Sequence, residues 1–277
     1  MWTNVRANRS DEYKRRGIDT VFLENKHLRV EMLAGKGGDV TEIRDKQTDV
    51  NVLLEAPHEW RAPSAGQIGA PDDDFTFMDY CPGGWNSVLP VAGGPSTQHG
   101  ATLALHGEST LVPFDVVAIE EADRVGVRLS TDLTCYPLYI ERKLTLGRGV
   151  SALQWDETAT NNGEVGVDYS WLQHIALGEP LVNPAAALDI DREHVLTDLD
   201  HDPETRRLPN GAEFEYPICE TDDGGVDMRK FPPSEDHVHD LAAFANLNEG
   251  RYTVSNSDSD LAATVEFDAG LYEYVWY

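Results

Sequence analysis

The chain has 277 residues and a formal net charge of −27, because it carries 49 Asp and Glu against 22 Lys and Arg. This length is enough for one large all-β domain or two ordinary domains, and no apolar run approaches the roughly 20 residues that a membrane span requires. An acidic surface repels phosphates, so the charge argues against a nucleic-acid partner, and the missing apolar run argues against a membrane protein.

The composition also indicates where the protein works. Acidic residues are abundant and lysine is scarce, which is typical of proteins kept soluble in concentrated salt, where a Debye length of about 3 Å mutes self-repulsion. The first residues, "MWTNVRANRSDEYKRRG", do not resemble a signal peptide. Cys81, Cys135 and Cys219 are odd in number and far apart, which favours reduced thiols. We therefore expect a halophilic, cytoplasmic protein.

Short β-rich runs dominate the beginning of the chain. "TVFLEN" and "HLRVEML" are separated by Asn25 and Lys26, which predicts a hairpin, and "TEIRDKQTDVNVLLE" predicts a strand, a polar turn and a second strand. Residues 57–82 are irregular and rich in Pro, Gly and Asp. The stretch "GGWNSVLPVAGGPSTQHGATLALHGE" follows, and it predicts a loop-strand-loop segment that brings backbone and polar side chains close to a ligand.

Residues 111–162 predict an antiparallel meander. In "VGVRLSTDL", Val125, Val127, Leu129 and Leu133 share one strand face, while polar residues share the other. The run "LYIERKLTL" places Arg142 on the same face as four aliphatic residues. A buried arginine must be paired. Arg142 is therefore either held by a core carboxylate or directed into a concave sheet face that binds a polar ligand.

The organisation predicted from these elements is simple. Strands are many, and no long amphipathic helix, repeat or linker stands out, so we expect a single domain over residues 1–277. The fold class predicted is all-β, a large double-sheet sandwich.

Several motifs now point to one family. In order, the chain contains "KGGDVTEIRDKQTDVNVLL", "GGWNSVLPVAGG", "HGE", "IERKLTL", "DETATNNG" and "YSWLQHIALG". This series resembles the aldose 1-epimerase (galactose mutarotase-like) superfamily over nearly the whole chain. The resemblance implies a β-supersandwich of two large, mainly antiparallel sheets with a sugar site on its concave face. It also implies an isomerase that interconverts sugar anomers by His/Glu acid-base catalysis, acts on a small-molecule sugar, and needs no metal or organic cofactor.

The resemblance assigns roles to two histidines. His174 matches the family's catalytic acid, and histidine suits proton transfer near neutral pH. His106 matches the histidine that binds sugar hydroxyls, and its glycine neighbour would let a ligand approach the backbone. A lone histidine in a strand is otherwise a structural residue.

Further substrate-binding residues are predicted around them. Trp85 either stacks on the apolar face of a pyranose or packs in the core, and Asn86 can bond sugar hydroxyls in both directions. Arg142 is a further candidate for substrate binding. In "SEDHVHDL", Asp236 is the best match to the carboxylate that binds sugar hydroxyls in the family.

The catalytic base is the point where the sequence departs from the family. The terminal "LYEYVWY" resembles the strand before the family's glutamate, so Glu273 is the late glutamate available for that role. Either the chain lacks its last strands, or it uses another base, or it has lost epimerase activity. This departure keeps open a non-catalytic carbohydrate-binding or sensing protein on the same fold. A third alternative is a cupin-like metalloprotein, in which His237 and His239 bind a metal ion.

Overall fold

The computed structural model describes residues 6–62, 76–98, 100–191, 194–199, 205–222 and 224–277, with residues 6–12 described by their backbone alone. The chain divides into two compact units, Met1–Leu177 and Gly178–Tyr277. The single-domain organisation expected from the sequence stays a prediction.

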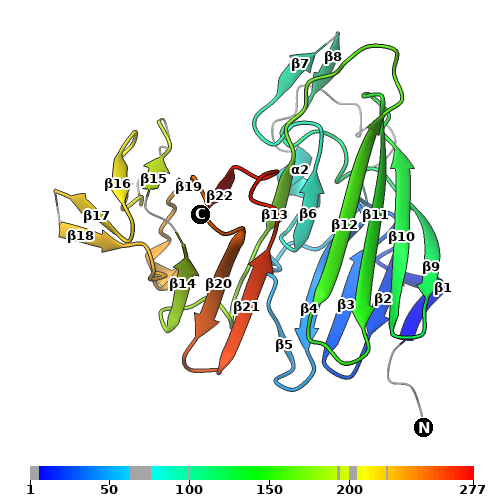
Figure 1. The fold of residues 1–277 in the computed structure, drawn as a ribbon, viewed down its shortest axis with the longest axis horizontal. Coiled ribbons are helices and arrows are strands. Elements are labelled where there is room, and N and C mark those ends of the chain that lie inside the picture. Colours follow the sequence, from blue (N-terminus) through cyan, green and yellow to red (C-terminus); the bar gives the residue numbers. More distant parts are fainter. Residues whose placement is uncertain (1–5, 63–75, 99, 192–193, 200–204, 223) are drawn as a thin grey trace. The chain divides into compact units, whose positions relative to one another are not determined.

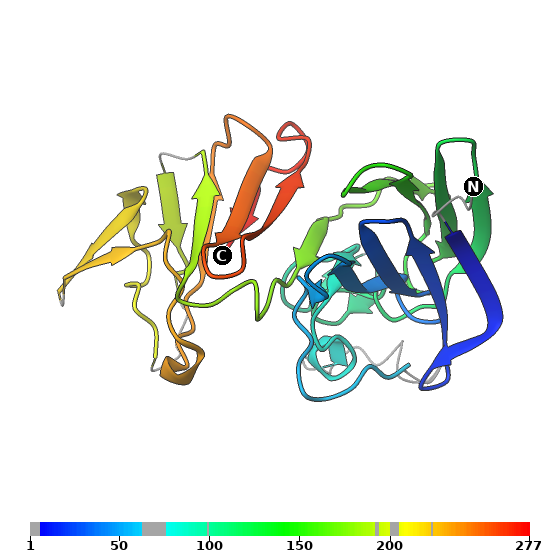
Figure 2. The ribbon, with the colours of Figure 1, turned by 90° about the horizontal axis from the view of Figure 1, so that it is seen from below.

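Two antiparallel sheets make up most of the first unit. One has the order β1-β2-β3-β4-β6-β13, with β5 paired to β4, and the other has the order β12-β11-β10-β9. They lie face to face as two layers (Figures 1 and 2). The strands of the first sheet are β1 (Arg6–Arg15), β2 (Ile18–Glu24), β3 (Leu28–Leu33), β4 (Asp39–Asp45), β5 (Val50–Asn51), β6 (Trp85–Val88) and β13 (Leu172–Ile175). Those of the second are β9 (Asp115–Glu120), β10 (Arg124–Asp132), β11 (Leu138–Gly147) and β12 (Leu153–Asn161).

The remaining elements of the first unit are short. A ribbon of β7 (Ser96–Gln98) and β8 (Ala101–Leu103) stands beside the sheets, and the helix α2 (Thr76–Tyr80) precedes β6. No helix in the described part of the chain is long and apolar enough to cross a membrane. Cys81, Cys135 and Cys219 are unpaired, as expected from their spacing.

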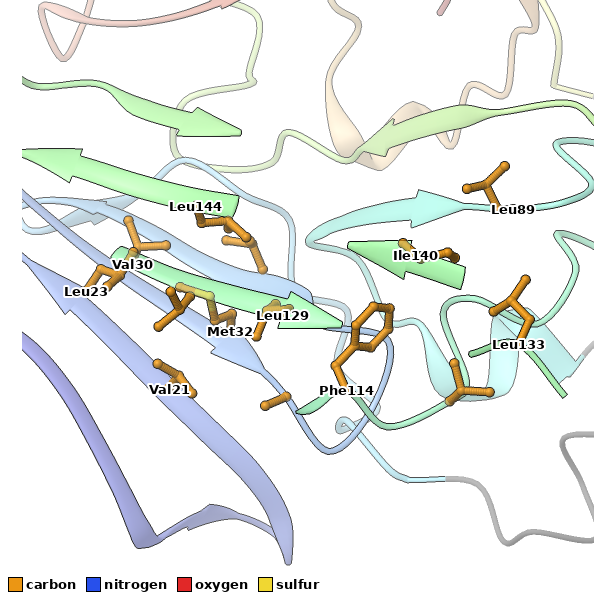
Figure 3. Close-up of a cluster of buried hydrophobic side chains, with 14 of the residues drawn as sticks. Val21, Leu23, Val30, Met32, Leu89, Phe114, Leu129, Leu133, Ile140 and Leu144 are labelled. Atoms are coloured by element: carbon orange, nitrogen blue, oxygen red, sulfur yellow. The ribbon is translucent and has the colours of Figure 1, made fainter. Parts of the chain in front are cut away.

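The core of the first unit lies between its two sheets. Side chains of β2 and β3 meet those of β10 and β11, as Figure 3 shows for Leu23, Val30, Leu129 and Leu144. Val125, Val127, Leu129 and Leu133 are all buried, so the alternation predicted for β10 is confirmed. An aliphatic side chain taken out of water in this way contributes about 1.5–3 kcal/mol.

A buried asparagine ties the two sheets together at one end. Asn25 sits in the predicted hairpin turn between β2 and β3, and its Oδ1 accepts hydrogen bonds from the backbone N–H groups of His27 and Leu28. Its Nδ2 donates to the carbonyls of Gly147 and Val150, in the turn between β11 and β12. The side chain thus fixes the ends of two hairpins that are far apart in sequence.

The second unit is built of smaller antiparallel sheets. Their orders are β14-β20-β21, β16-β15-β19-β22 and β17-β18, and a short 3₁₀ helix, η1, precedes β19. The elements are β14 (Ala186–Ile190), β15 (His194–Thr197), β16 (Glu213–Glu215), β17 (Ile218–Thr221), β18 (Gly224–Asp227), η1 (Ser234–Asp236), β19 (Ala242–Ala245), β20 (Arg251–Asn256), β21 (Leu261–Glu266) and β22 (Tyr274–Trp276).

Candidate functional site

Strand register places three polar residues side by side on one face of the larger sheet. Val40 of β4 pairs with Trp85 of β6, so Asp39 is adjacent to Asn86. His174 of β13 pairs directly with Asn86. Residues opposite each other on neighbouring strands project to the same side. Asp39, Asn86 and His174 therefore form a row on the face that points away from the second sheet, which we call the site face.

His106 joins His174 on the site face. The two imidazole rings are 5.8 Å apart between centroids, and Phe77 of α2 contacts both rings edge-on, at 4.5 Å from His106 and 5.5 Å from His174. Phe77 also packs with Cys81 and Val88 in a small apolar cluster. The structure thus brings together the two histidines singled out in the sequence, beneath a short helix.

The backbone at His106 has an unusual conformation that positions its ring. His106 and Gly107 are both left-handed, with φ of 61° and 63°. A Cβ atom at Gly107 would lie 2.6 Å from the carbonyl oxygen of Leu89, so only glycine fits there. Left-handed non-glycine residues are uncommon and are over-represented at functional sites.

Burial shapes the protonation of both histidines. It lowers the pKa of His106 to about 4, and the neighbouring His174 adds to this effect. Burial also lowers the pKa of His174, but here its own backbone and the Asp39 carboxylate oppose the shift. Both imidazoles are therefore biased towards the neutral form, and among the described residues a carboxylate, that of Asp39, favours the cation of His174.

A buried ion pair lies next to this row. Lys36 and Asp39 are both fully buried, and Lys36 Nζ donates to Asp39 Oδ2. Lys36 Nζ is also 3.1 Å from Cys81 Sγ and lies over the ring of Trp60, 5.1 Å from its centroid. Burial raises the pKa of the Cys81 thiol to about 11, so this thiol is protonated at neutral pH.

Unsatisfied polar atoms are concentrated on the site face. Asp39 Oδ1, both amide atoms of Asn86, His106 Nδ1 and His174 Nδ1 are buried and have no hydrogen-bond partner among the described residues. Native proteins leave few such atoms without a protein or water partner. A group of them in one place is suited to binding a polar ligand rich in hydroxyl groups.

The opposite face of the same strands is occupied by a closed polar network. Glu157 Oε2 accepts hydrogen bonds from Ser87 Oγ at 2.6 Å and from Gln173 Nε2 at 3.1 Å, and Glu157 Oε1 accepts one from Arg142 Nε. Arg142 donates its remaining nitrogens to the carbonyls of Gly37 and Ser87 and is fully buried over the ring of Phe114.

These contacts correct two of the predicted substrate contacts. Arg142 is held by a core carboxylate, the structural alternative offered by the sequence, because a buried guanidinium needs a full set of acceptors. Trp85 stacks on Trp155 with ring centroids 4.3 Å apart and donates Nε1–H to Gln173. Trp85 therefore packs between the sheets, and Asn86, its neighbour in sequence, projects to the site face.

The two candidate carboxylates lie in the second unit. Asp236 is exposed at the end of η1, and Glu273 is exposed just before β22 rather than within a strand. Asp240, close to Asp236 in sequence, is instead engaged by Arg207 Nε at 2.7 Å and by the backbone N–H groups of Arg207 and Leu208.

The metal-binding alternative rests on His237 and His239. His237 has a left-handed backbone with φ of 49°, and both side chains are exposed. Within the described ranges, no three His, Cys, Asp or Glu side chains are grouped closely enough to hold a metal ion. A cupin-like site there has no third ligand from these residues.

Three residues near the two histidines were not predicted from the sequence as site residues: Lys36, Asp39 and Phe77. "KGGDV" contributed to the family resemblance only as part of a longer motif. The sequence feature that could have identified the buried ion pair is a Lys and an Asp three residues apart, with glycines and apolar residues around them. This spacing indicates a buried pair only once the strand pairing is known.

No family model matches the chain. A search of curated proteins likewise finds no significant match. Solved structures do match. The Slr1438 protein from Synechocystis is 19% identical, with a TM-score of 0.63 over 98% of this chain and 84% of that one. A candidate aldose 1-epimerase from Klebsiella pneumoniae is 12% identical, with a TM-score of 0.67 over 98% and 69%. Galactose 1-epimerase from Lactobacillus acidophilus is 14% identical, with a TM-score of 0.55 over 91% and 77%.

At these identities the likeness concerns the fold. The chain has the galactose mutarotase-like fold, all-β with multiple antiparallel sheets, so the fold class and the family resemblance drawn from the sequence are confirmed at that level.

Proposed function

We propose that the protein is an aldose 1-epimerase-type isomerase that interconverts the anomers of a small sugar. The observation that carries the proposal is the pair of imidazoles 5.8 Å apart on the site face, next to the unsatisfied amide of Asn86. Hydroxyl groups of a sugar can donate to and accept from such atoms. The names of the structural neighbours from Klebsiella and Lactobacillus support the same reaction class.

In the proposed reaction His174 is the general acid. Its imidazolium gives a proton to the ring oxygen while a base takes the proton from the C1 hydroxyl, and the bond between C1 and the ring oxygen breaks. The open-chain aldehyde rotates about its C1–C2 bond, and the reverse proton transfers close the ring as the other anomer. His106, biased towards the neutral form, positions the ring through its hydroxyls. Among late glutamates, Glu273 remains the candidate for the base, and Asp236 for a sugar-binding carboxylate.

Anomer exchange measured by NMR or polarimetry tests this proposal. The wild-type protein is expected to accelerate interconversion of at least one common aldose, and His174→Ala is expected to lower the rate by about 10²–10⁴-fold. Glu273→Gln tests the base in the same assay. His194→Ala is a matched control, because His194 is exposed on β15 and has no assigned role. Full activity in His174→Ala would remove His174 from the acid role.

A second candidate function is non-catalytic sugar binding on the same fold. The observation that favours it is the exposure of Glu273, which lies outside β22. Calorimetry combined with NMR distinguishes the two candidates. Binding of a sugar without faster anomer exchange would select the binding protein.

We further propose that the protein works in the cytoplasm of a halophile, which rests on the net charge of −27. Self-repulsion of this charge opposes folding, and salt screens it. The midpoint temperature of unfolding is therefore expected to rise as the salt concentration increases from about 0.05 M to 2 M. A midpoint that does not rise would contradict the halophilic assignment.

A further inference from the structure

The row on the site face joins three neighbouring strands. Adjacent strands in a sheet are about 4.8 Å apart, so Asn86 of β6 stands between Asp39 of β4 and His174 of β13. Asp39 and Asn86 are fully buried. A carboxylate, an amide and an imidazole therefore lie side by side across the sheet. The carboxylate and the amide are shielded from bulk water.

Lys36 fixes the state of Asp39. Its ammonium group donates to Oδ2, and a buried pair in this contact keeps the carboxylate ionised. Oδ1 has no partner in the described part of the chain. Leaving a charged oxygen buried and unsatisfied is costly, so it needs a donor.

Asn86 stands between Asp39 and His174 without bonding either of them, since neither of its amide atoms has a partner among the described residues. Its amide hydrogens and oxygen lone pairs are therefore left for the hydroxyl groups of a ligand. The influence of Asp39 on His174 is thus exerted by its charge, across one intervening strand.

We propose that Asp39, held by Lys36, is a positioning residue whose charge, two strands away on the site face, makes His174, and not His106, the histidine that carries the proton. This inference rests on the proposed function, because the proton matters only if the site performs acid-base chemistry. Asp39 does not touch the sugar in this scheme.

The surroundings of the two histidines support a difference between them. The titratable and charged groups that the structure places near His174 include His106, 5.8 Å away between ring centroids, and Asp39 with its partner Lys36, which also contacts Cys81. Cys81 is protonated at neutral pH, and Asp39 raises the pKa of His174 against the effect of burial. For His106, burial and the neighbouring His174 both lower the pKa. The pKa values of the two histidines are thus shifted differently, as is typical of an acid beside a neutral hydrogen-bonding partner.

NMR titration of the free protein tests the proposal. The imidazole signals are assigned with His106→Gln and His174→Gln, and Asp39→Asn is compared with the wild type. We expect the pKa of His174 to fall by about one unit, because the variant removes the carboxylate and leaves Lys36 unpaired. The pKa of His106 is expected to change by less than half as much.

Glu157→Gln is the matched control. It makes the same carboxylate-to-amide change in a buried ion pair, but on the opposite face of β6. We expect it to lower stability and to move the pKa of His174 by less than half the shift in Asp39→Asn. If Asp39→Asn does not fold, the double variant Lys36→Met with Asp39→Leu replaces the pair by apolar groups, a change that buried pairs often tolerate. The same direction of shift is expected there.

An unchanged pKa of His174 in the folded variant, or equal shifts of both histidines, would overturn the proposal. The titration uses no sugar, so its outcome is separate from that of the function. If the wild type accelerates no anomer exchange, the proposed function fails, while the effect of Asp39 on His174 is still decided by the titration.

Discussion

The two faces of strands β6 and β13 have opposite characters. On the face between the sheets, Ser87 and Gln173 join Arg142 and Glu157 in a network in which each charged group is paired. On the site face, Asn86, one residue away along the chain, has no partner for either amide atom among the described residues. The same short strands therefore carry a satisfied polar network on one side and an unsatisfied one on the other.

This difference separates structural polar residues from functional candidates. A buried polar network stabilises a fold only when its members are satisfied. An unsatisfied group lowers stability until a ligand or water binds it. The interior network is therefore expected to respond to substitution through stability, and the site face through binding and protonation.

Breaking the interior ion pair is expected to have the largest effect. Arg142→Met leaves Glu157 charged and without its cation inside the sandwich, which is expected to lower the free energy of unfolding by about 3–5 kcal/mol. Denaturant unfolding measures this. Arg128→Met, in an exposed pair with Glu141 on the adjacent strands, is the control and is expected to cost less than about 1 kcal/mol. Equal losses in the two variants would contradict the structural role of Arg142.

Removing one hydroxyl from the interior network is expected to have a smaller effect. Ser87 Oγ donates to Glu157 and accepts from Trp171 Nε1 and Gln173 Nε2, both at 3.1 Å. Ser87→Ala leaves Trp171 Nε1–H without its acceptor and removes one donor from Glu157, while Gln173 Nε2 still donates to Glu157. The free energy of unfolding is expected to fall by about 1–3 kcal/mol. A loss below about 0.5 kcal/mol in denaturant unfolding would show that the network is not closed.

The neighbouring substitution on the site face is expected to have the opposite sign. Asn86→Leu replaces a buried, unsatisfied amide by an apolar group of similar size, so stability is expected to stay unchanged or to rise by about 1 kcal/mol. Denaturant unfolding of Asn86→Leu and Ser87→Ala under the same conditions compares the free energies of unfolding for the two faces of the strand. A loss as large as that of Ser87→Ala would mean that Asn86 has a structural partner.

A separate effect expected on the site face is a pH dependence due to His106. Burial lowers its pKa to about 4 in the folded protein, against about 6.5 in the unfolded chain. The unfolded state therefore binds more protons between these values, and the free energy of unfolding falls as the pH decreases from about 6.5 to about 4. His106→Gln is expected to weaken this dependence. Identical slopes in the variant and the wild type would exclude His106 as a contributor.

Local patterns in the sequence were sufficient for much of the fold. Alternation identified the buried face of β10, and the position of Arg142 among aliphatic residues required a buried partner, which is Glu157. The motifs containing His106 and His174 also marked the residues that meet on the site face. The alternation in β10 and the need for a partner of Arg142 could be predicted because strand alternation and the cost of burying a charge are local properties, whereas the two histidines came from the family resemblance.

The choice between open alternatives needed the tertiary structure. The sequence by itself determined an all-β fold, two histidines of interest and an arginine that must be paired. Only the pairing of β4 with β6 and of β6 with β13 placed Asp39 on the same face as Asn86 and His174. The same pairing directs the side chain of Trp85 into the core, against Trp155. A shift of one residue in register moves every side chain of a strand to the other face, and register between strands far apart in sequence is set by the packing of the whole sheet.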